Sequence, residues 1–124
     1  MDSNNQDNLK IKVIDYGMGN IQSVINALVK LGCDVSIIDK PLETSDFDAL
    51  ILPGVGAFGE AIRNIKNSGL HNFIYESVLN QKKPILGICL GMQLLADTSE
   101  ENGNYKGLSL IPGDVKKIPL KDDL

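Results

Sequence analysis

Short apolar runs that alternate with helix-type runs constrain the fold of this chain more than any other feature. Four runs have the length and composition of β-strands, and they read KIKVIDYG, DVSIID, FDALILPG and KKPILGI. Helix-type runs, with apolar residues three and four positions apart, lie between the first and second strands, between the third and fourth, and after the fourth. This order predicts an α/β fold with a parallel sheet, flanking helices and right-handed crossovers.

Capping and breaking residues predict where the helices begin and end. Asn20 is the expected N-cap of the first helix and Gly32 its stop. The sequence NSGLH, residues 67–71, is expected to separate two helical runs before the fourth strand. The last helix is predicted over residues 90–99, and two short β-type runs are predicted within residues 107–120.

Size and composition predict one domain and exclude several classes of partner. With 124 residues and 43% apolar content, the chain can bury one modest core. Residues 1–9 are rich in Asn and Asp and are expected to form a disordered arm, while residues 10–124 form the domain. The 12 basic and 16 acidic residues form no large basic cluster, so neither a nucleic acid nor an anionic membrane is an expected partner.

The N-terminus and the cysteines predict the compartment. The first ten residues are polar and lack the apolar stretch of a secretory signal, and no apolar run approaches the roughly 20 residues that span a bilayer. Cys33 and Cys89 have no metal-ligand spacing. We therefore expect a cytoplasmic protein with reduced thiols, no metal site and no cofactor.

Glycine-rich loops follow three of the predicted strands. They read DYGMGN after the first strand, LPGVGAFG after the third and GICLGMQ after the fourth. Ligands of open parallel sheets bind outside the carboxyl ends of the strands. These three loops are therefore the predicted functional site.

Cys89 lies in the third of these loops, between Gly87 and Gly91. This is the spacing of a nucleophile elbow, G-x-[nucleophile]-x-G, with Cys in place of Ser. A helix that begins near Leu90 would favour the thiolate, and its first backbone N–H could bind the oxygen of a tetrahedral intermediate. The glycines of residues 53–56 could turn a second N–H toward the same space.

A simpler interpretation is that each cysteine is a small buried apolar residue, which is the commoner role of a lone cysteine. Cys33 fits that interpretation, because it precedes a strand and has a single glycine beside it. For Cys89 the two flanking glycines and the strand-to-helix position favour the nucleophile. The sequence PGVGAFG by itself indicates little, since it lacks both the Lys-Ser/Thr of a P-loop and the G-x-G-x-x-G spacing.

Four blocks of the sequence resemble a known family. The blocks IDYGMGNIQSV, LPGVGAFGEA, PILGICLGMQLL and SEENGNYKGLSLIPGDV, in this order, are similar to the glutaminase subunits of imidazole glycerol phosphate synthase. These are class I, triad-type glutamine amidotransferases of histidine biosynthesis. DYGMGN favours this subfamily over the glutaminases of the anthranilate, carbamoyl phosphate and GMP synthases. The resemblance implies a flavodoxin-like class I amidotransferase fold, glutamine as substrate, and a cyclase subunit as the heterodimeric partner that receives ammonia.

The resemblance also implies roles for single residues. Cys89 matches the nucleophile that attacks the side-chain amide carbon of glutamine, forms a thioester and releases ammonia. The N–H of Leu90 and an amide of the segment Gly54 to Val55 match the oxyanion hole.

Other positions match substrate and partner contacts. Gly56 and Gln93 match the lining of the glutamine pocket, and Glu101 matches an acidic residue suited to the substrate's α-ammonium. For Glu101 an exposed charge cluster is an equally good interpretation. Met18 and Asn20 match the surface that docks on the cyclase, although helix capping and turn formation also explain this loop.

The chain departs from the family after the nucleophile. The family's triad adds a histidine and a glutamate that follow the cysteine, whereas the one histidine here, His71, precedes Cys89 and is expected to be a surface or helix-cap residue. The chain is expected to be the N-terminal, C-terminally incomplete part of an amidotransferase domain, either a fragment or a truncated product, and to be inactive alone.

Three functions remain open from the sequence. The first is a glutaminase that supplies ammonia to the cyclase. The second is a related glutaminase that serves amino-sugar synthesis for surface polysaccharide. The third is a docking remnant without turnover.

Overall fold

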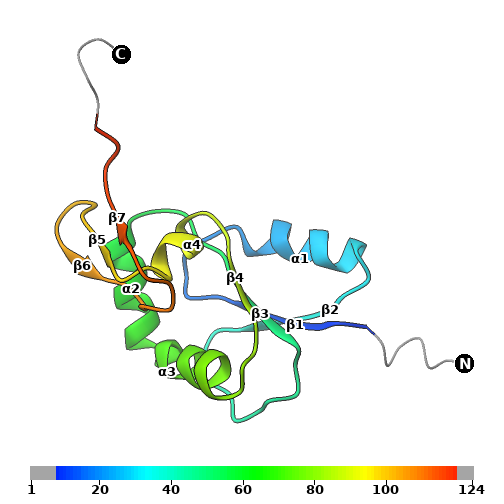
Figure 1. The fold of residues 1–124 in the computed structure, drawn as a ribbon. Helices are drawn as coiled ribbons and strands as arrows, with labels where there is room; N and C mark the ends of the chain where they lie inside the picture. Colours follow the sequence, from blue (N-terminus) through cyan, green and yellow to red (C-terminus); the bar gives the residue numbers. More distant parts are fainter. Residues whose placement is uncertain (1–7, 120–124) are drawn as a thin grey trace, which may run out of the picture.

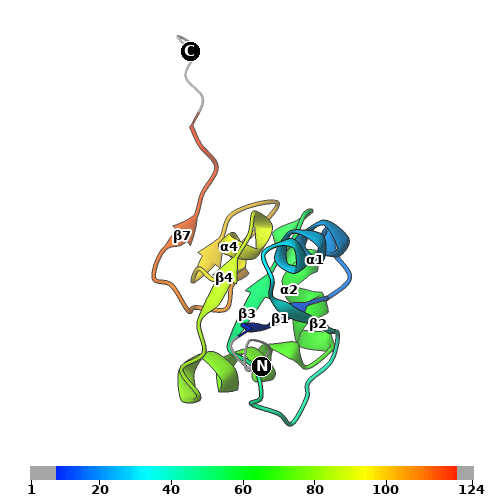
Figure 2. The same ribbon diagram turned by 90° about the vertical axis from the view of Figure 1, so that its right-hand side faces the viewer.

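The computed structural model describes residues 8–119, and most of the arm predicted over residues 1–9 lies outside them. The chain folds around a four-stranded, fully parallel sheet with the order β2-β1-β3-β4 (Figures 1 and 2). The predicted α/β class and parallel sheet are confirmed. The strands are β1 (Lys10–Ile14), β2 (Asp34–Ile38), β3 (Ala49–Leu52) and β4 (Ile85–Gly87).

Helices cover the sheet unequally on its two faces. The helix α1 (Ile21–Lys30) packs on one face, whereas α2 (Phe58–Asn67) and α3 (Leu70–Tyr75) pack on the other (Figure 1). Strand β3 alternates between these layers, because Ile51 faces α1 while Leu50 and Leu52 face α2. The larger core lies on the α2 side, and α1 has no fully buried residue.

The predicted helix boundaries hold for the first three helices. The Asn20 side chain accepts a hydrogen bond from Ser23 N at 3.3 Å and caps α1, and Gly32 follows its end with a φ of +89°. Gly69, at φ +78°, separates α2 from α3 within the predicted break. After α3 the chain continues in a π-type turn, η2 (Glu76–Asn80).

The last helix is shorter than the sequence predicts. The helix α4 spans Leu90–Leu94 and not residues 90–99. Backbone N–H groups of residues 108–110 donate to the carbonyls of Leu94, Leu95 and Ala96 at 2.8–3.0 Å. In a longer helix these carbonyls would accept from the N–H groups of the next helical turn. A distant segment therefore ends the helix, which no local pattern could show.

A small second sheet follows α4. Its order is β6-β5-β7, with β5 (Thr98–Ser99), β6 (Tyr105–Lys106) and β7 (Asp114–Val115). Of the two β-type runs predicted near the C-terminus, the second contains β7. The first is not a strand, because its backbone N–H groups donate to the carbonyls at the C-terminal end of α4.

Among residues 8–119, no helix has the length and apolar character needed to cross a membrane.

Candidate functional site

The three predicted loops meet at the carboxyl ends of β1, β3 and β4, next to α4 (Figure 1). Gly19 of the first loop lies so close to Gly54 of the second that a Cβ on Gly19 would be 3.3 Å from Gly54 Cα. The second loop reaches the third through a hydrogen bond from Leu90 N to Gly54 O at 3.3 Å. The fold therefore joins Gly19 and Leu90, which are 71 positions apart, into one cluster of backbone contacts through Gly54.

Cys89 occupies a strained turn between β4 and α4. Its φ of 55° and ψ of −121° belong to a region that residues with a side chain rarely adopt. Gly91 packs so tightly that a Cβ there would overlap Leu52 O, and a Cβ on Gly87 would lie 2.6 Å from Met92 Cα. Cys89 itself is exposed. This backbone has the sharp strand-to-helix turn expected of a nucleophile elbow, and it leaves Cys89 exposed at the end of β4.

The two cysteines differ as the sequence indicates. Cys33 is half-buried and packs with the apolar residues under α1, which agrees with a small core residue. Cys89 makes no hydrogen bond to a histidine or carboxylate side chain within residues 8–119.

The backbone N–H of Leu90 is occupied in this conformation. It donates to Gly54 O at 3.3 Å, so in this conformation it is not free to bind another acceptor. Gly54 is buried, whereas Val55 is 59% exposed and Gly56 has a φ of +115°. A rotation of the Gly54–Val55 peptide would break the hydrogen bond from Leu90 N to Gly54 O, and the glycines on both sides of Val55 widen the range of backbone angles open to this loop.

Tyr16 is a site residue that the sequence reasoning missed. Its hydroxyl donates to Pro53 O at 2.7 Å, and the side chain is only 5% exposed. Burial raises the pKa of the phenol above its ordinary value, so the group stays neutral. Within KIKVIDYG, Tyr16 reads as one more apolar strand residue; its position directly before a glycine-rich loop was the available signal.

Gln93 and Glu101 line a common hollow of about 420 Å³ beside α4 and the second sheet. Glu101 Oε1 accepts a hydrogen bond from Phe58 N at 3.0 Å. Since the N-cap residue of α2, Ala57, has no side-chain acceptor, Glu101 caps this helix from 43 positions away. Neither interpretation of Glu101 from the sequence included this contact.

The remaining predicted residues lie around the same loops. Met18 contacts Gly56, since a Cβ on Gly56 would be 2.7 Å from Met18 Cε. Asn20 is exposed at the start of α1. Cys89 and Gly56 do not line the hollow that contains Gln93 and Glu101.

His71 is remote from this site. It lies in the first turn of α3, which both views place at the end of the molecule away from α4 (Figures 1 and 2). The ring is half-buried and meets Tyr75 edge-on, and its Nδ1 has no hydrogen-bond partner among the described residues. The ring is partly exposed, in keeping with the expected surface histidine, whereas the alternative of a helix cap is wrong, because no side chain caps α3.

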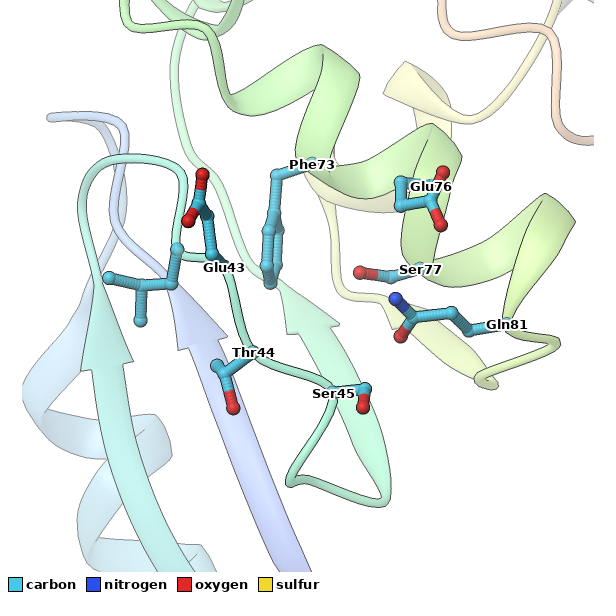
Figure 3. Close-up of a pocket in the computed structure, with 8 residues that line it drawn as sticks. Glu43, Thr44, Ser45, Phe73, Glu76, Ser77 and Gln81 are labelled. Carbon is cyan, nitrogen blue, oxygen red and sulfur yellow. The ribbon is translucent and has the colours of Figure 1, made fainter.

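A second hollow, of about 320 Å³, lies between the loop after β2 and the helical segment α3–η2 (Figure 3). Ser77 and Gln81 face it, and Phe73 forms one wall. None of the predicted site residues lines it. Within residues 8–119, no group of three or more His, Cys, Asp or Glu side chains is placed to hold a metal ion.

Comparison with known sequences identifies a family and several similar proteins. The profile of the family described as glutamine amidotransferase class-I matches residues 12–119. A protein of Moorella thermoacetica, the imidazole glycerol phosphate synthase subunit HisH, is 51% identical over 109 residues, which are 88% of this chain and 51% of that protein. The protein of the same name from Bacillus subtilis is 46% identical over 113 residues, 91% of this chain and 53% of its own length. The chain thus spans about half the length of these relatives.

Solved structures share the fold. A crystal structure of a glutamine amidotransferase superposes with a TM-score of 0.71 at 20% identity, over 86% of this chain and 55% of the other. A putative peptidase E protein of Listeria monocytogenes superposes with a TM-score of 0.65 at 17% identity, over 88% of this chain and 67% of the other. These likenesses support the predicted flavodoxin-like, class I amidotransferase architecture.

Proposed function

Because the chain belongs to the class-I glutamine amidotransferase family, we propose that it is the nucleophile-bearing part of a glutaminase subunit of imidazole glycerol phosphate synthase. The observation that carries this proposal is the backbone of Cys89, which is strained, exposed and held between two tightly packed glycines. The similar proteins are named as subunits of this synthase, which favours a glutaminase of this synthase over a glutaminase of amino-sugar synthesis.

The proposed reaction is the hydrolysis of the side-chain amide of glutamine. The Cys89 thiolate attacks the amide carbon, and the carbonyl electron pair moves to oxygen to form a tetrahedral oxyanion. When this intermediate collapses, the C–N bond breaks, a proton goes to the leaving nitrogen, and a γ-glutamyl thioester and ammonia result. Water then hydrolyses the thioester to glutamate and regenerates the thiol.

The oxyanion would be bound by Leu90 N–H together with an amide of the Gly54–Val55 segment. In the conformation described here Gly54 O occupies Leu90 N–H, so the proposed oxyanion hole is closed. Opening requires the peptide between Gly54 and Val55 to turn, and each donor that then points at the oxyanion typically contributes about 10²–10³ in kcat. A closed resting state would keep glutamine hydrolysis slow until an event outside the active site turns this peptide.

The substrate would lie between the elbow and the neighbouring hollow. Gly56 and Gln93 line the glutamine side chain, and Glu101 binds the α-ammonium with the carboxylate oxygen that does not accept from Phe58 N–H. The general base and acid, a histidine with a glutamate, would come from the part of the relatives' length that this chain does not span.

Ammonia would pass to a cyclase subunit docked on the loop that contains Met18 and Asn20. This loop lies against Gly54 and Gly56, so a partner bound there sits within one layer of residues of the reacting cysteine. The proposed setting is the cytoplasm, where thiols stay reduced, and the chemistry requires no cofactor.

Two measurements test the proposed function. Limiting iodoacetamide followed by peptide mass analysis should label Cys89 ahead of Cys33. Mixing the chain with the C-terminal half of the Moorella thermoacetica relative, a cyclase subunit and glutamine should release ammonia. This activity should vanish in Cys89→Ala and survive in Cys33→Ala and His71→Ala. Ammonia release that persists in Cys89→Ala, or preferential labelling of Cys33, would refute the proposal.

A further inference from the structure

The Tyr16 side chain connects the end of β1 to the end of β3. Its neighbours are fixed to the sheet, because Asp15 N donates to Ile38 O at 2.9 Å and Gly17 N donates to Asp15 Oδ1 at 3.0 Å. From this position the Tyr16 hydroxyl reaches the loop of residues 53–56 and donates to Pro53 O at 2.7 Å. The hydroxyl is buried and neutral, so water does not compete for this hydrogen bond.

The hydrogen bond lies one peptide away from the proposed oxyanion segment. Pro53 O belongs to the peptide before Gly54, and Gly54 O belongs to the peptide that accepts from Leu90 N–H. The phenol also fills the space beside Gly54, because a Cβ at that position would overlap Tyr16 Oη. A rotation of the Gly54–Val55 peptide that also shifts Gly54 Cα must therefore displace the phenol or break its hydrogen bond to Pro53 O.

We propose that Tyr16 is a positioning residue, whose hydroxyl holds Pro53 O and thereby keeps Gly54 O on Leu90 N–H, the closed state of the oxyanion hole. This inference rests on the proposed function, since the orientation of this peptide matters to catalysis only if Cys89 is the nucleophile. In this role Tyr16 acts through the backbone of the second loop, where its hydroxyl meets Pro53 O and Gly54.

The same residue links the proposed docking loop to the site. Gly19, three residues after Tyr16, packs on Gly54, and Asn20 caps α1. A partner that displaces the loop of residues 17–20 would therefore move the phenol and the Gly54 backbone together. Tyr16 is the side chain through which such a displacement reaches the Pro53 carbonyl.

Hydrogen exchange of backbone amides, followed by ¹⁵N NMR on the 124-residue chain, tests the proposal without turnover. In Tyr16→Phe the amide of Leu90 should exchange about tenfold faster, which corresponds to a loss of about 1.4 kcal/mol from the local closed state. The amides of Leu50 and Leu108 report on the rest of the fold, since they donate to Pro84 O at 3.0 Å and to Leu94 O at 2.8 Å. They should change less than twofold.

Two further variants complete the design. Tyr105→Phe is the matched control, because it also removes a phenol that donates to a backbone carbonyl, Asn102 O at 3.3 Å, but in another loop. It should leave the exchange of Leu90 unchanged. Gly54→Ala should reproduce the local effect of Tyr16→Phe, since its methyl group needs the position of the hydroxyl.

Unchanged exchange of Leu90 in Tyr16→Phe would overturn the proposal. Equal acceleration of Leu90, Leu50 and Leu108 would also overturn it, because Tyr16 would then support the whole fold and not this peptide. The exchange test and the labelling test separate the two proposals. If Leu90 exchange is unchanged in Tyr16→Phe while Cys89 is labelled ahead of Cys33, only the role of Tyr16 is refuted. If Cys33 is labelled first, the proposed function is refuted whatever the exchange shows.

Discussion

Replacing Cys89 by glycine should leave the chain more stable than replacing it by alanine, although both changes remove the proposed nucleophile. The residue has a φ of 55° and a ψ of −121°, a conformation that costs a residue with a Cβ about 1–3 kcal/mol and costs glycine almost nothing. Alanine keeps this strain, so Cys89→Ala and Cys89→Gly differ mainly in backbone strain. Against this gain, glycine loses about 0.4–1 kcal/mol relative to alanine through the entropy of the unfolded chain. The net expectation is that Cys89→Gly is more stable than Cys89→Ala by about 1 kcal/mol, within a range of about 0–2.6 kcal/mol.

The assay is urea unfolding followed by circular dichroism, with the slope m unchanged between the variants. The same two substitutions at Cys33 provide the control, because Cys33 is not among the non-glycine residues with positive φ. There the order should reverse, with glycine less stable than alanine by about 0.5–1 kcal/mol. If Cys89→Gly were no more stable than Cys89→Ala, the turn would not be strained and the elbow geometry would lose its main support.

Three further results are expected. Glu101→Ala should lower the free energy of unfolding by about 1 kcal/mol, because Phe58 N–H at the start of α2 loses its acceptor, whereas Glu101→Gln should retain most of it; equal losses would contradict the cap. Burial raises the pKa of Tyr16, so the stability from its neutral phenol is complete below about pH 10 and is lost as the pH rises above that, where the unfolded chain ionises first. The free energy of unfolding should fall more steeply above pH 10 in the wild type than in Tyr16→Phe, and parallel curves would refute this. Leu86 is 57% exposed on β4 beside an apolar hollow of about 210 Å³, so binding of an apolar dye should decrease in Leu86→Lys more than in Leu31→Lys, a control at the end of α1; an equal decrease would place the dye elsewhere.

Local signals predicted most of the fold. Asn20 and Gly32 bound α1 because capping and a positive φ are properties of one or two residues. The apolar run of β3 predicted a strand covered on both faces, and Ile51 and Leu50 do face opposite layers. The predicted end of α4 was wrong because a distant segment supplies the hydrogen bonds there. The helix ends at Leu94, since backbone N–H groups of residues 108–110 donate to the carbonyls at its end.

The elbow could be predicted from the sequence because its constraints are local. A side chain on Gly87 or Gly91 would clash with neighbouring backbone in this strand-to-helix turn. The spacing of the two glycines around Cys89 therefore predicts the turn from five consecutive residues. The family resemblance of the other loops rests equally on short blocks of sequence.

The sequence alone determined which loops form the candidate site, since parallel strands bring their carboxyl ends to one edge of the sheet and glycine-rich loops follow three of those strands. Only the tertiary structure decided how the loops meet: Tyr16 on Pro53 O, Leu90 N–H on Gly54 O, and Glu101 on Phe58 N–H. Each of these hydrogen bonds joins residues 36 to 43 positions apart. A donor and an acceptor that far apart leave no periodic or spacing signal in the chain, because their meeting depends on the packing of every element between them.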